Sequence, residues 1–179
     1  MLRLDDTMAI VVDIQERMLP VIHDHEELEK NCVILIKGLK ALDIPLVITQ
    51  QYTKGLGMTT PALLEAAKTQ DYHEKVAFSV LREENTKAAV KEQNRKNVLV
   101  IGIEAHICVL QTCMDLKEQG YHPYLVVDCI GSRLKSNKKM AIKRAIQEGV
   151  KITSYESLLF ELMGRADIEA FRTISKLIK

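Results

Sequence analysis

Cys108 is the residue of this 179-residue chain whose surroundings best suit nucleophilic chemistry. It follows an apolar run at residues 97–103, which contains Gly102, and it stands near the start of a helical pattern. A helix N-terminus carries about half a positive charge and several unpaired backbone N–H groups. That field favours a thiolate over a thiol, and the N–H groups can hold a developing oxyanion. The alternative is an inert cysteine packed under the helix.

Two charged residues complete a possible reaction centre with this cysteine. Asp13 follows the first apolar run, and Lys75 begins a later one, at residues 75–80. A carboxylate could accept the thiol proton, and a nearby lysine with the helix N-terminus would lower the cysteine pKa by about two units. The alternatives are a turn or cap residue for Asp13 and a solvated strand end for Lys75.

The hydrophobic pattern predicts the elements that must position these residues. Strands are expected at residues 8–12, 45–50, 75–80, 97–103, 123–127 and 150–154, and helices at residues 24–42, 61–68, 83–95, 106–119 and 136–148. Asp24 and Glu27 resemble a capping box. The tail from residue 155 reads as two helices broken near Gly164, with an apolar stripe that should pack on its own domain.

This alternation predicts one domain over residues 1–179, with an α/β fold of three layers, αβα and Rossmann-like. A mainly parallel six-stranded sheet would carry helices on both faces. Ligands bind such sheets at the carboxyl ends of the strands. Asp13, Gln50, Gln51 and Asp128 end strands in this scheme, whereas Lys75 would precede its strand and reach the site only through a folded-over loop.

Composition narrows the classes of partner. The net charge is +1, from 25 basic and 24 acidic residues, so we expect no nucleic-acid partner. No apolar run approaches the roughly 20 residues of a membrane span, and no signal peptide is recognised, so we expect no membrane partner. The four cysteines show neither a C-x-x-C pair nor zinc spacing, which favours reduced thiols and a cytoplasmic location.

Several motifs in order carry a resemblance to a known family. They are VVDIQ at 11–15, HEKVAFS at 73–79, GIEAHICVLQT at 102–112 and VVDCIGSR at 126–133. The chain resembles the isochorismatase-like cysteine hydrolases, which include nicotinamidases, and with QYTKGLG at 51–57 it is most similar to the isochorismatase domain-containing proteins. The resemblance implies an Asp13–Lys75–Cys108 triad, and a homo-oligomer. It also implies a cis peptide bond between Ile103 and Glu104, aiming the backbone N–H groups of Glu104 and Cys108 at one oxyanion hole.

These features together predict a metal-independent hydrolase that cleaves a small amide-type C–N bond through a cysteine thioester. The segment 50–58 lacks the histidines and aspartate that hold a metal in nicotinamidases, so neither a metal nor another cofactor is expected. The small-molecule substrate would contact candidate residues on nearby segments, namely Gln15, Gln50, Tyr52 and His106. Two alternatives remain: vinyl-ether hydrolysis of the isochorismatase type, with Asp13 as general acid, and a non-catalytic binding or redox-sensing module pairing Cys108 with Cys113.

Overall fold

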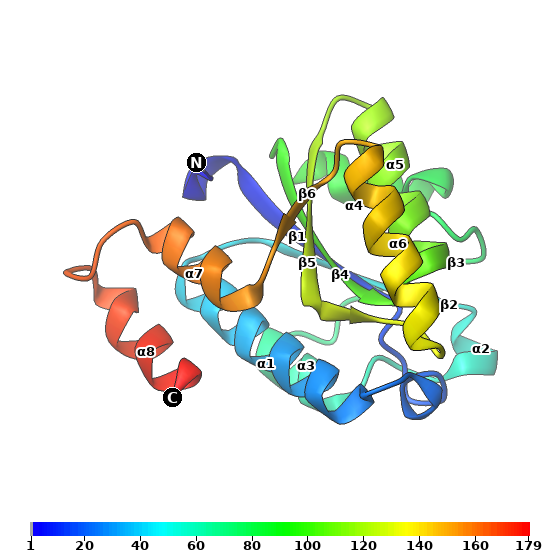
Figure 1. Cartoon of the computed structure of the whole chain (residues 1–179), viewed down its shortest axis with the longest axis horizontal. Helices are drawn as coiled ribbons and strands as arrows, with labels where there is room; N and C mark the ends of the chain where they lie inside the picture. Colours follow the sequence, from blue (N-terminus) through cyan, green and yellow to red (C-terminus); the bar gives the residue numbers. More distant parts are fainter. Residues whose placement is uncertain (1) are drawn as a thin grey trace.

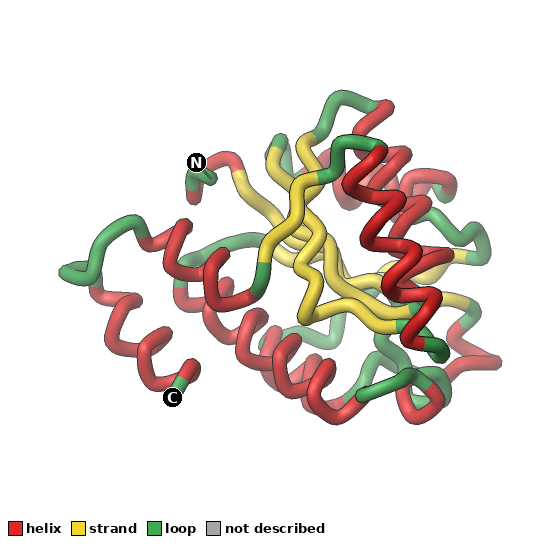
Figure 2. Tube along the Cα trace, in the orientation of Figure 1, coloured by secondary structure: helices red, strands yellow, loops and turns green. Residues whose placement is uncertain are grey.

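The sheet is the centre of the molecule. The computed structural model describes residues 2–179, and its six strands are arranged in the order β3-β2-β1-β4-β5-β6, with every neighbouring pair parallel. The strands are β1 (Thr7–Val12), β2 (Leu46–Gln51), β3 (His73–Lys75), β4 (Asn97–Ile103), β5 (His122–Gly131) and β6 (Lys151–Thr153). Figure 2 shows this sheet enclosed between layers of helix. The predicted three-layer α/β fold is therefore confirmed.

Helices cover both faces of the sheet (Figure 1). One face carries α1 (His25–Ala41), α3 (Pro61–Ala67), α7 (Tyr155–Met163) and α8 (Glu169–Ile178). The other carries α4 (Glu84–Glu92), α5 (Leu110–Glu118) and α6 (Lys135–Gln147). A single-turn helix, α2 (Thr53–Leu56), lies beyond β2 in a segment for which the sequence predicted only a loop. None of the helices within residues 2–179 has the length and apolar character needed to cross a membrane.

The side chains of β1 alternate between two hydrophobic cores. Met8, Ile10 and Val12 pack with residues of α4, α5 and α6, whereas Ala9 and Val11 pack with residues of α1, α3 and α7. A strand buried on both faces must be apolar at every position, which explains the unbroken run at residues 8–12. This buried strand fixes the position of the residue that follows it.

The strand order creates one point where the direction of winding reverses. The chain proceeds from β1 through β2 to β3, and then returns to place β4 on the other side of β1. In open α/β sheets, the crevice for ligands lies beyond the carboxyl ends of the strands at such a reversal. Asp13 and Glu104 come directly after β1 and β4, so both lie at this crevice.

Three strands end in left-handed residues that are not glycine. Asp13 after β1 has φ 55°, Tyr52 after β2 has φ 38°, and Glu104 after β4 has φ 51°. This conformation costs about 1–2 kcal/mol for a residue with a side chain. The backbone is therefore strained just beyond the carboxyl ends of three strands, and strain of this kind is often found at functional sites.

The prediction of a strand at residues 75–80 is wrong. β3 ends at Lys75, and Val76 and Phe78 are 68% and 53% exposed rather than buried. The N–H groups of Val76 and Ala77 donate to Oε1 of Glu83 instead of to a neighbouring strand. An apolar run was thus mistaken for a buried strand, although it turns outward beyond the sheet. As a result, Lys75 ends its strand and lies at the carboxyl ends of the strands, as Asp13 does.

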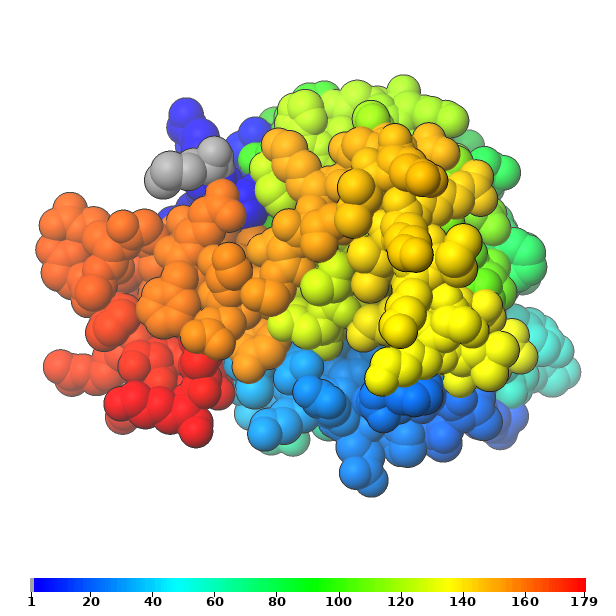
Figure 3. Space-filling model, viewed as in Figure 1, coloured from blue at the N-terminus to red at the C-terminus, as the bar shows by residue number. Residues whose placement is uncertain are grey.

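Two smaller expectations also need correction. Asp24 precedes α1 in a left-handed conformation, and its side chain pairs with His23 and caps no helical N–H group, so the predicted capping box is wrong. β5 continues to Gly131, which places Asp128 inside the strand and not at its end. The break at Gly164 and the docking of the tail are confirmed, because Ile174 of α8 is fully buried and α8 lies against α1 (Figure 3).

We expect Gly102→Ala to destabilise the protein by roughly 3 kcal/mol or more, measured as the free energy of unfolding in urea. A Cβ atom at this position would lie 2.3 Å from the carbonyl oxygen of Val12, and φ is +147°. Gly120→Ala is the matched control: φ is +80°, but no heavy atom lies within 4 Å, so about 1 kcal/mol is expected. Equal losses in the two variants would contradict close approach of β1 and β4 as the cause.

Candidate active site

Lys75 and Asp13 form an ion pair inside the protein. Nζ of Lys75 lies 2.6 Å from Oδ2 of Asp13, and the two side chains are 0% and 6% exposed. Nζ also donates to Oε1 of Gln51 at 2.9 Å and to the carbonyl oxygen of Ala77 at 3.2 Å. Thr49 donates to Oδ1 of the same carboxylate at 2.8 Å. Every proton of the ammonium has an acceptor, so the pair is held in one geometry.

Cys108 lies beside this carboxylate. It belongs to a π-helical turn, Ala105–Val109, which continues directly into α5. Burial raises the pKa of the thiol to about 12, the charge of Asp13 adds to the rise, and the charge of Lys75 opposes it. The expectation of a lowered cysteine pKa is therefore wrong. In the free protein the sulfur keeps its proton next to a group that can remove it.

The cis peptide bond implied by the family resemblance is absent. No cis bond occurs anywhere in residues 2–179, so the bond between Ile103 and Glu104 is trans. Glu104 turns the chain by adopting a left-handed conformation instead, and its carbonyl oxygen accepts from the N–H of Ile107. A role in an oxyanion hole for the backbone N–H groups of Glu104 and Cys108 remains a prediction.

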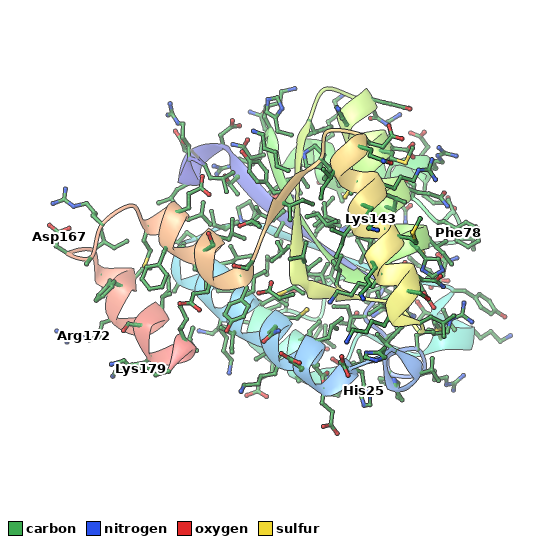
Figure 4. The ribbon with its side chains drawn as sticks, in the orientation of Figure 1. His25, Phe78, Lys143, Asp167, Arg172 and Lys179 are labelled. Carbon is green, nitrogen blue, oxygen red and sulfur yellow. The ribbon has the colours of Figure 1, made fainter. Side chains whose placement is uncertain are left out.

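A pocket of about 250 Å³ opens onto the sulfur. Its polar or charged lining residues are Asp13, Gln51, Glu104, Cys108 and Arg133. Its apolar lining residues are Met18, Leu56, Phe78, Ile103 and Ile107. In Figure 4, Phe78 lies at the right-hand edge, on the side where Figure 1 labels β2, β3 and α2. Such a volume suits a small ligand with limited polar groups.

The four predicted substrate-binding residues do not line this pocket. Gln15 is fully buried, and its amide bonds the backbone of Gln51 and Gly57. Gln50 is also fully buried, between the hydroxyl groups of Thr53 and Thr59. Both glutamines thus hold the segment after β2 in place.

The other two candidates lie nearer to solvent. Tyr52 is 52% exposed and follows β2 in its left-handed conformation. His106 is half-buried: its Nδ1 lies 3.1 Å from the hydroxyl of Ser132, and its Nε2 lies 3.2 Å from the amide nitrogen of Asn137. A direct contact of either residue with substrate stays a prediction.

Sequence reasoning missed most of the pocket wall. Gln51 could have been predicted because ligands bind at the carboxyl ends of parallel strands, and Arg133 because it ends the motif VVDCIGSR. Met18 and Phe78 carried no signal because they come from irregular segments, and Leu56 carried none because it ends the single-turn helix α2, which the hydrophobic pattern did not predict. Phe78 was instead assigned to a strand.

Asp128 belongs to a different pocket, of about 280 Å³, between α1 and α6. Burial raises the pKa of its carboxyl, and one of its oxygens accepts from the N–H of Tyr155. The pocket includes none of Asp13, Lys75 and Cys108. Asp128 is therefore not part of the centre at the ends of β1, β3 and β4.

No group of three His, Cys, Asp or Glu side chains within residues 2–179 is arranged to hold a metal ion. All four cysteines are free in the described chain, and Cys113, the proposed redox partner, is fully buried. The lack of a metal requirement remains a prediction that enzymology must test.

Alkylation of Cys108 by iodoacetamide should accelerate up to at least about pH 10, without a plateau near neutrality, because only the thiolate reacts. The pH is to be varied while the Cys108 peptide is quantified by mass spectrometry, with glutathione as a reference thiol. A plateau below about pH 8 would show that the resting thiol is already primed, contrary to its burial beside Asp13.

Comparisons with known proteins agree with this fold and with the motifs. A family model described as an isochorismatase domain matches residues 7–157. The secreted isochorismatase effector Isc1 of Phytophthora sojae is 40% identical over 149 residues, which cover 81% of this chain and 71% of the effector. Isochorismatase domain-containing protein 2 of Danio rerio is 31% identical over 172 residues, covering 96% of this chain and 86% of its own.

A solved structure is similar over almost the whole chain. It is described as the MAR1 ribonuclease of Caenorhabditis elegans, is 34% identical, and covers 99% of this chain and 91% of its own with a TM-score of 0.91. The family model alone spans most of the sequence, and it includes Asp13, Lys75 and Cys108. The resemblance inferred from the motifs is thus confirmed, and the chain belongs to the isochorismatase family of hydrolases.

Proposed function

We propose that this protein hydrolyses a small amide-type C–N bond, without a metal, through a thioester on Cys108. The observation that carries the proposal is that the carboxylate of the buried Asp13–Lys75 ion pair and the thiol of Cys108 line one small pocket. A base, a nucleophile and a fixed counter-charge at one pocket are the parts that nucleophilic catalysis requires.

The buried ion pair explains how Asp13 can serve as the base. Nζ of Lys75 donates to Oδ2 and Thr49 donates to Oδ1, so the carboxylate is fixed in orientation, and it lines the same pocket as Cys108. The ammonium also offsets the negative charge that would otherwise oppose formation of a thiolate. Because burial raises the pKa of the thiol, we expect the proton to move only once substrate is bound.

The reaction then follows from these contacts. Asp13 takes the proton from Sγ as the sulfur bonds to the carbonyl carbon, and the resulting oxyanion is held by the backbone N–H groups of Glu104 and Cys108. The C–N bond breaks as Asp13 returns the proton to the leaving nitrogen. Asp13 next accepts a proton from water as the water attacks the thioester, and the sulfur leaves and recovers a proton as the acid product departs.

The second candidate is hydrolysis of a vinyl ether, favoured by the name of the effector that is 40% identical to this chain. It would use Asp13 as a general acid and would not need the thiol. A buried thiol that lines the same pocket as Asp13 supplies the nucleophile that only the first candidate uses, and this argues for the first candidate.

The test is a substrate panel of primary amides, ureas and carbamoyl compounds, followed by intact-mass spectrometry of rapidly quenched reactions. A mass increase equal to the acyl group, located on Cys108, is the expected result. Isochorismate and a short RNA belong in the panel, the latter because one similar structure is described as a ribonuclease. Turnover of either without an acyl adduct would overturn the proposal.

Assembly and location remain predictions of the same kind. A homo-oligomer is expected and can be tested by light scattering during size-exclusion chromatography. A cytoplasmic location is expected as well, although a similar protein is described as secreted.

A further inference from the structure

The ion pairs in the wall of the pocket beside Cys108 leave it without a net charge. Lys75 pairs with Asp13 at 2.6 Å, and Arg133 pairs with Glu104. Asp13, Glu104 and Arg133 are the charged residues among those that line the pocket, so each has a partner of opposite sign. A charged ligand would give up its hydration on entry and would meet no uncompensated counter-charge among these lining residues.

The rest of the wall is mainly apolar. Its apolar side chains come from separate segments: Met18 after β1, Leu56 in α2, Phe78 after β3, Ile103 at the end of β4 and Ile107 in the π-helical turn. Phe78, which is labelled in Figure 4, is 53% exposed. Covering such a surface with a hydrocarbon group is favourable in proportion to the area removed from water. The pocket therefore suits a hydrocarbon group better than a charged one.

The size of the pocket limits the length of that group. Its volume of about 250 Å³ is below the roughly 300–1,000 Å³ typical of sites for drug-sized molecules. An acyl chain of a few carbon atoms is in keeping with this volume. Each methylene group that such a chain buries should strengthen binding by about fourfold.

We propose that the pocket selects uncharged amides whose acyl group is a short hydrocarbon chain. The inference rests on the proposed function for the amide, and it adds the chemical class of the acyl group. It also places dicarboxylates such as isochorismate outside the preferred class, because two negative charges would compete with Glu104 for a single arginine of the pocket wall.

The test compares amides of matched length that differ in charge at the far end of the acyl chain. Butyramide ends in a methyl group, succinamate in a carboxylate, and 3-aminopropanamide in an ammonium group. Acetamide completes the series as a shorter uncharged amide. Dissociation constants are measured by nuclear magnetic resonance titration of the full-length Cys108→Ala protein, which has no sulfur to form a thioester, so turnover cannot distort the binding measurement.

Butyramide should bind at least about tenfold more tightly than either charged analogue, because it loses no charge hydration. It should bind about 15-fold more tightly than acetamide, since it has two additional methylene groups. Tighter binding of succinamate overturns the inference, and would show that Arg133, whose side chain is 57% exposed, binds a carboxylate of the ligand. Equal binding of acetamide and butyramide also overturns it, as does the lack of measurable binding by every amide.

Phe78→Ala and a matched control locate the hydrocarbon chain in this pocket. In the Cys108→Ala background, Phe78→Ala should weaken the binding of butyramide by about fivefold and that of acetamide by no more than about twofold. Phe160→Ala is the control, because Phe160 is also an exposed aromatic residue but lies on α7 and does not line the pocket.

The control should leave both dissociation constants unchanged. Thermal unfolding of each variant shows whether it is folded. Equal effects of Phe78→Ala and Phe160→Ala on butyramide, or no effect of Phe78→Ala, would overturn the placement of the acyl chain against Phe78.

These titrations separate the inference from the proposed function, because binding to Cys108→Ala requires no chemical step. Selective binding of butyramide, together with no acyl adduct on the wild-type protein from any amide, would leave the preference for uncharged apolar ligands standing and refute the hydrolase. An acyl adduct on wild-type Cys108 that forms as readily from succinamate as from butyramide would do the reverse.

Discussion

Turnover of an amide substrate should fall by about 10⁴-fold or more in Cys108→Ala, and the acyl adduct should disappear. Without the sulfur, Asp13 and Lys75 remain in place but have no nucleophile to activate. The side chain is small and buried, so the variant should stay folded and lose little stability. Initial rates and intact masses, measured on the same preparation, provide the check.

Cys113→Ala is the control for this experiment. Cys113 lies on α5, is fully buried, and has a thiol pKa raised to about 12 by burial alone. It has neither a carboxylate partner nor access to the pocket in the described chain, so its removal should leave turnover within a few-fold of wild type. Activity retained in Cys108→Ala would instead favour the vinyl-ether alternative, with Asp13 acting alone.

Lys75→Met should have the largest effect on stability, a loss of about 3–5 kcal/mol at neutral pH. The change leaves the carboxylate of Asp13 buried without its counter-charge, since Nζ is the group 2.6 Å from Oδ2. Chemical denaturation gives the loss directly. Activity should fall as well, because the thiolate formed beside Asp13 would no longer face a cation.

A comparison with an exposed ion pair identifies the cause of this loss. Arg144→Met provides the comparison, because it breaks an ion pair with Glu148 whose side chains are 57% and 46% exposed, and it should cost no more than about 1 kcal/mol. A deficit in Lys75→Met no larger than that of Arg144→Met would contradict an isolated buried charge as the cause.

The sequence was informative where one physical rule decided the outcome. Residues 8–12 are apolar at every position, which requires a strand buried on both faces and puts Asp13 at its end. The same rule applies to residues 97–103, which form a fully buried strand before Cys108. The sheet and the position of Asp13 were therefore predictable from the pattern, whereas the family and the contact of Lys75 with Asp13 were expected only from the motif resemblance.

The parts that failed depend on tertiary context. The apolar run after Lys75 looked like a strand, but the carboxylate of Glu83 binds its first N–H groups and the chain turns outward. The cysteine pKa moved in the opposite direction from the one expected, because burial and Asp13 outweigh Lys75. Gln15 and Gln50 have the polarity of binding residues, yet their amides bond to neighbouring protein groups. A hydrophobic or polar pattern in a single sequence does not indicate which of several possible tertiary contacts a side chain makes.

The strand that carries Lys75 is the least secured strand of the candidate active site. β3 has three residues, stands at the margin of the sheet and is paired with β2 alone. Short marginal strands fray more readily than the interior of a sheet. A local opening there would withdraw the cation while β1, β4 and both hydrophobic cores stayed intact, so the protein can lose its chemical competence long before it loses its fold.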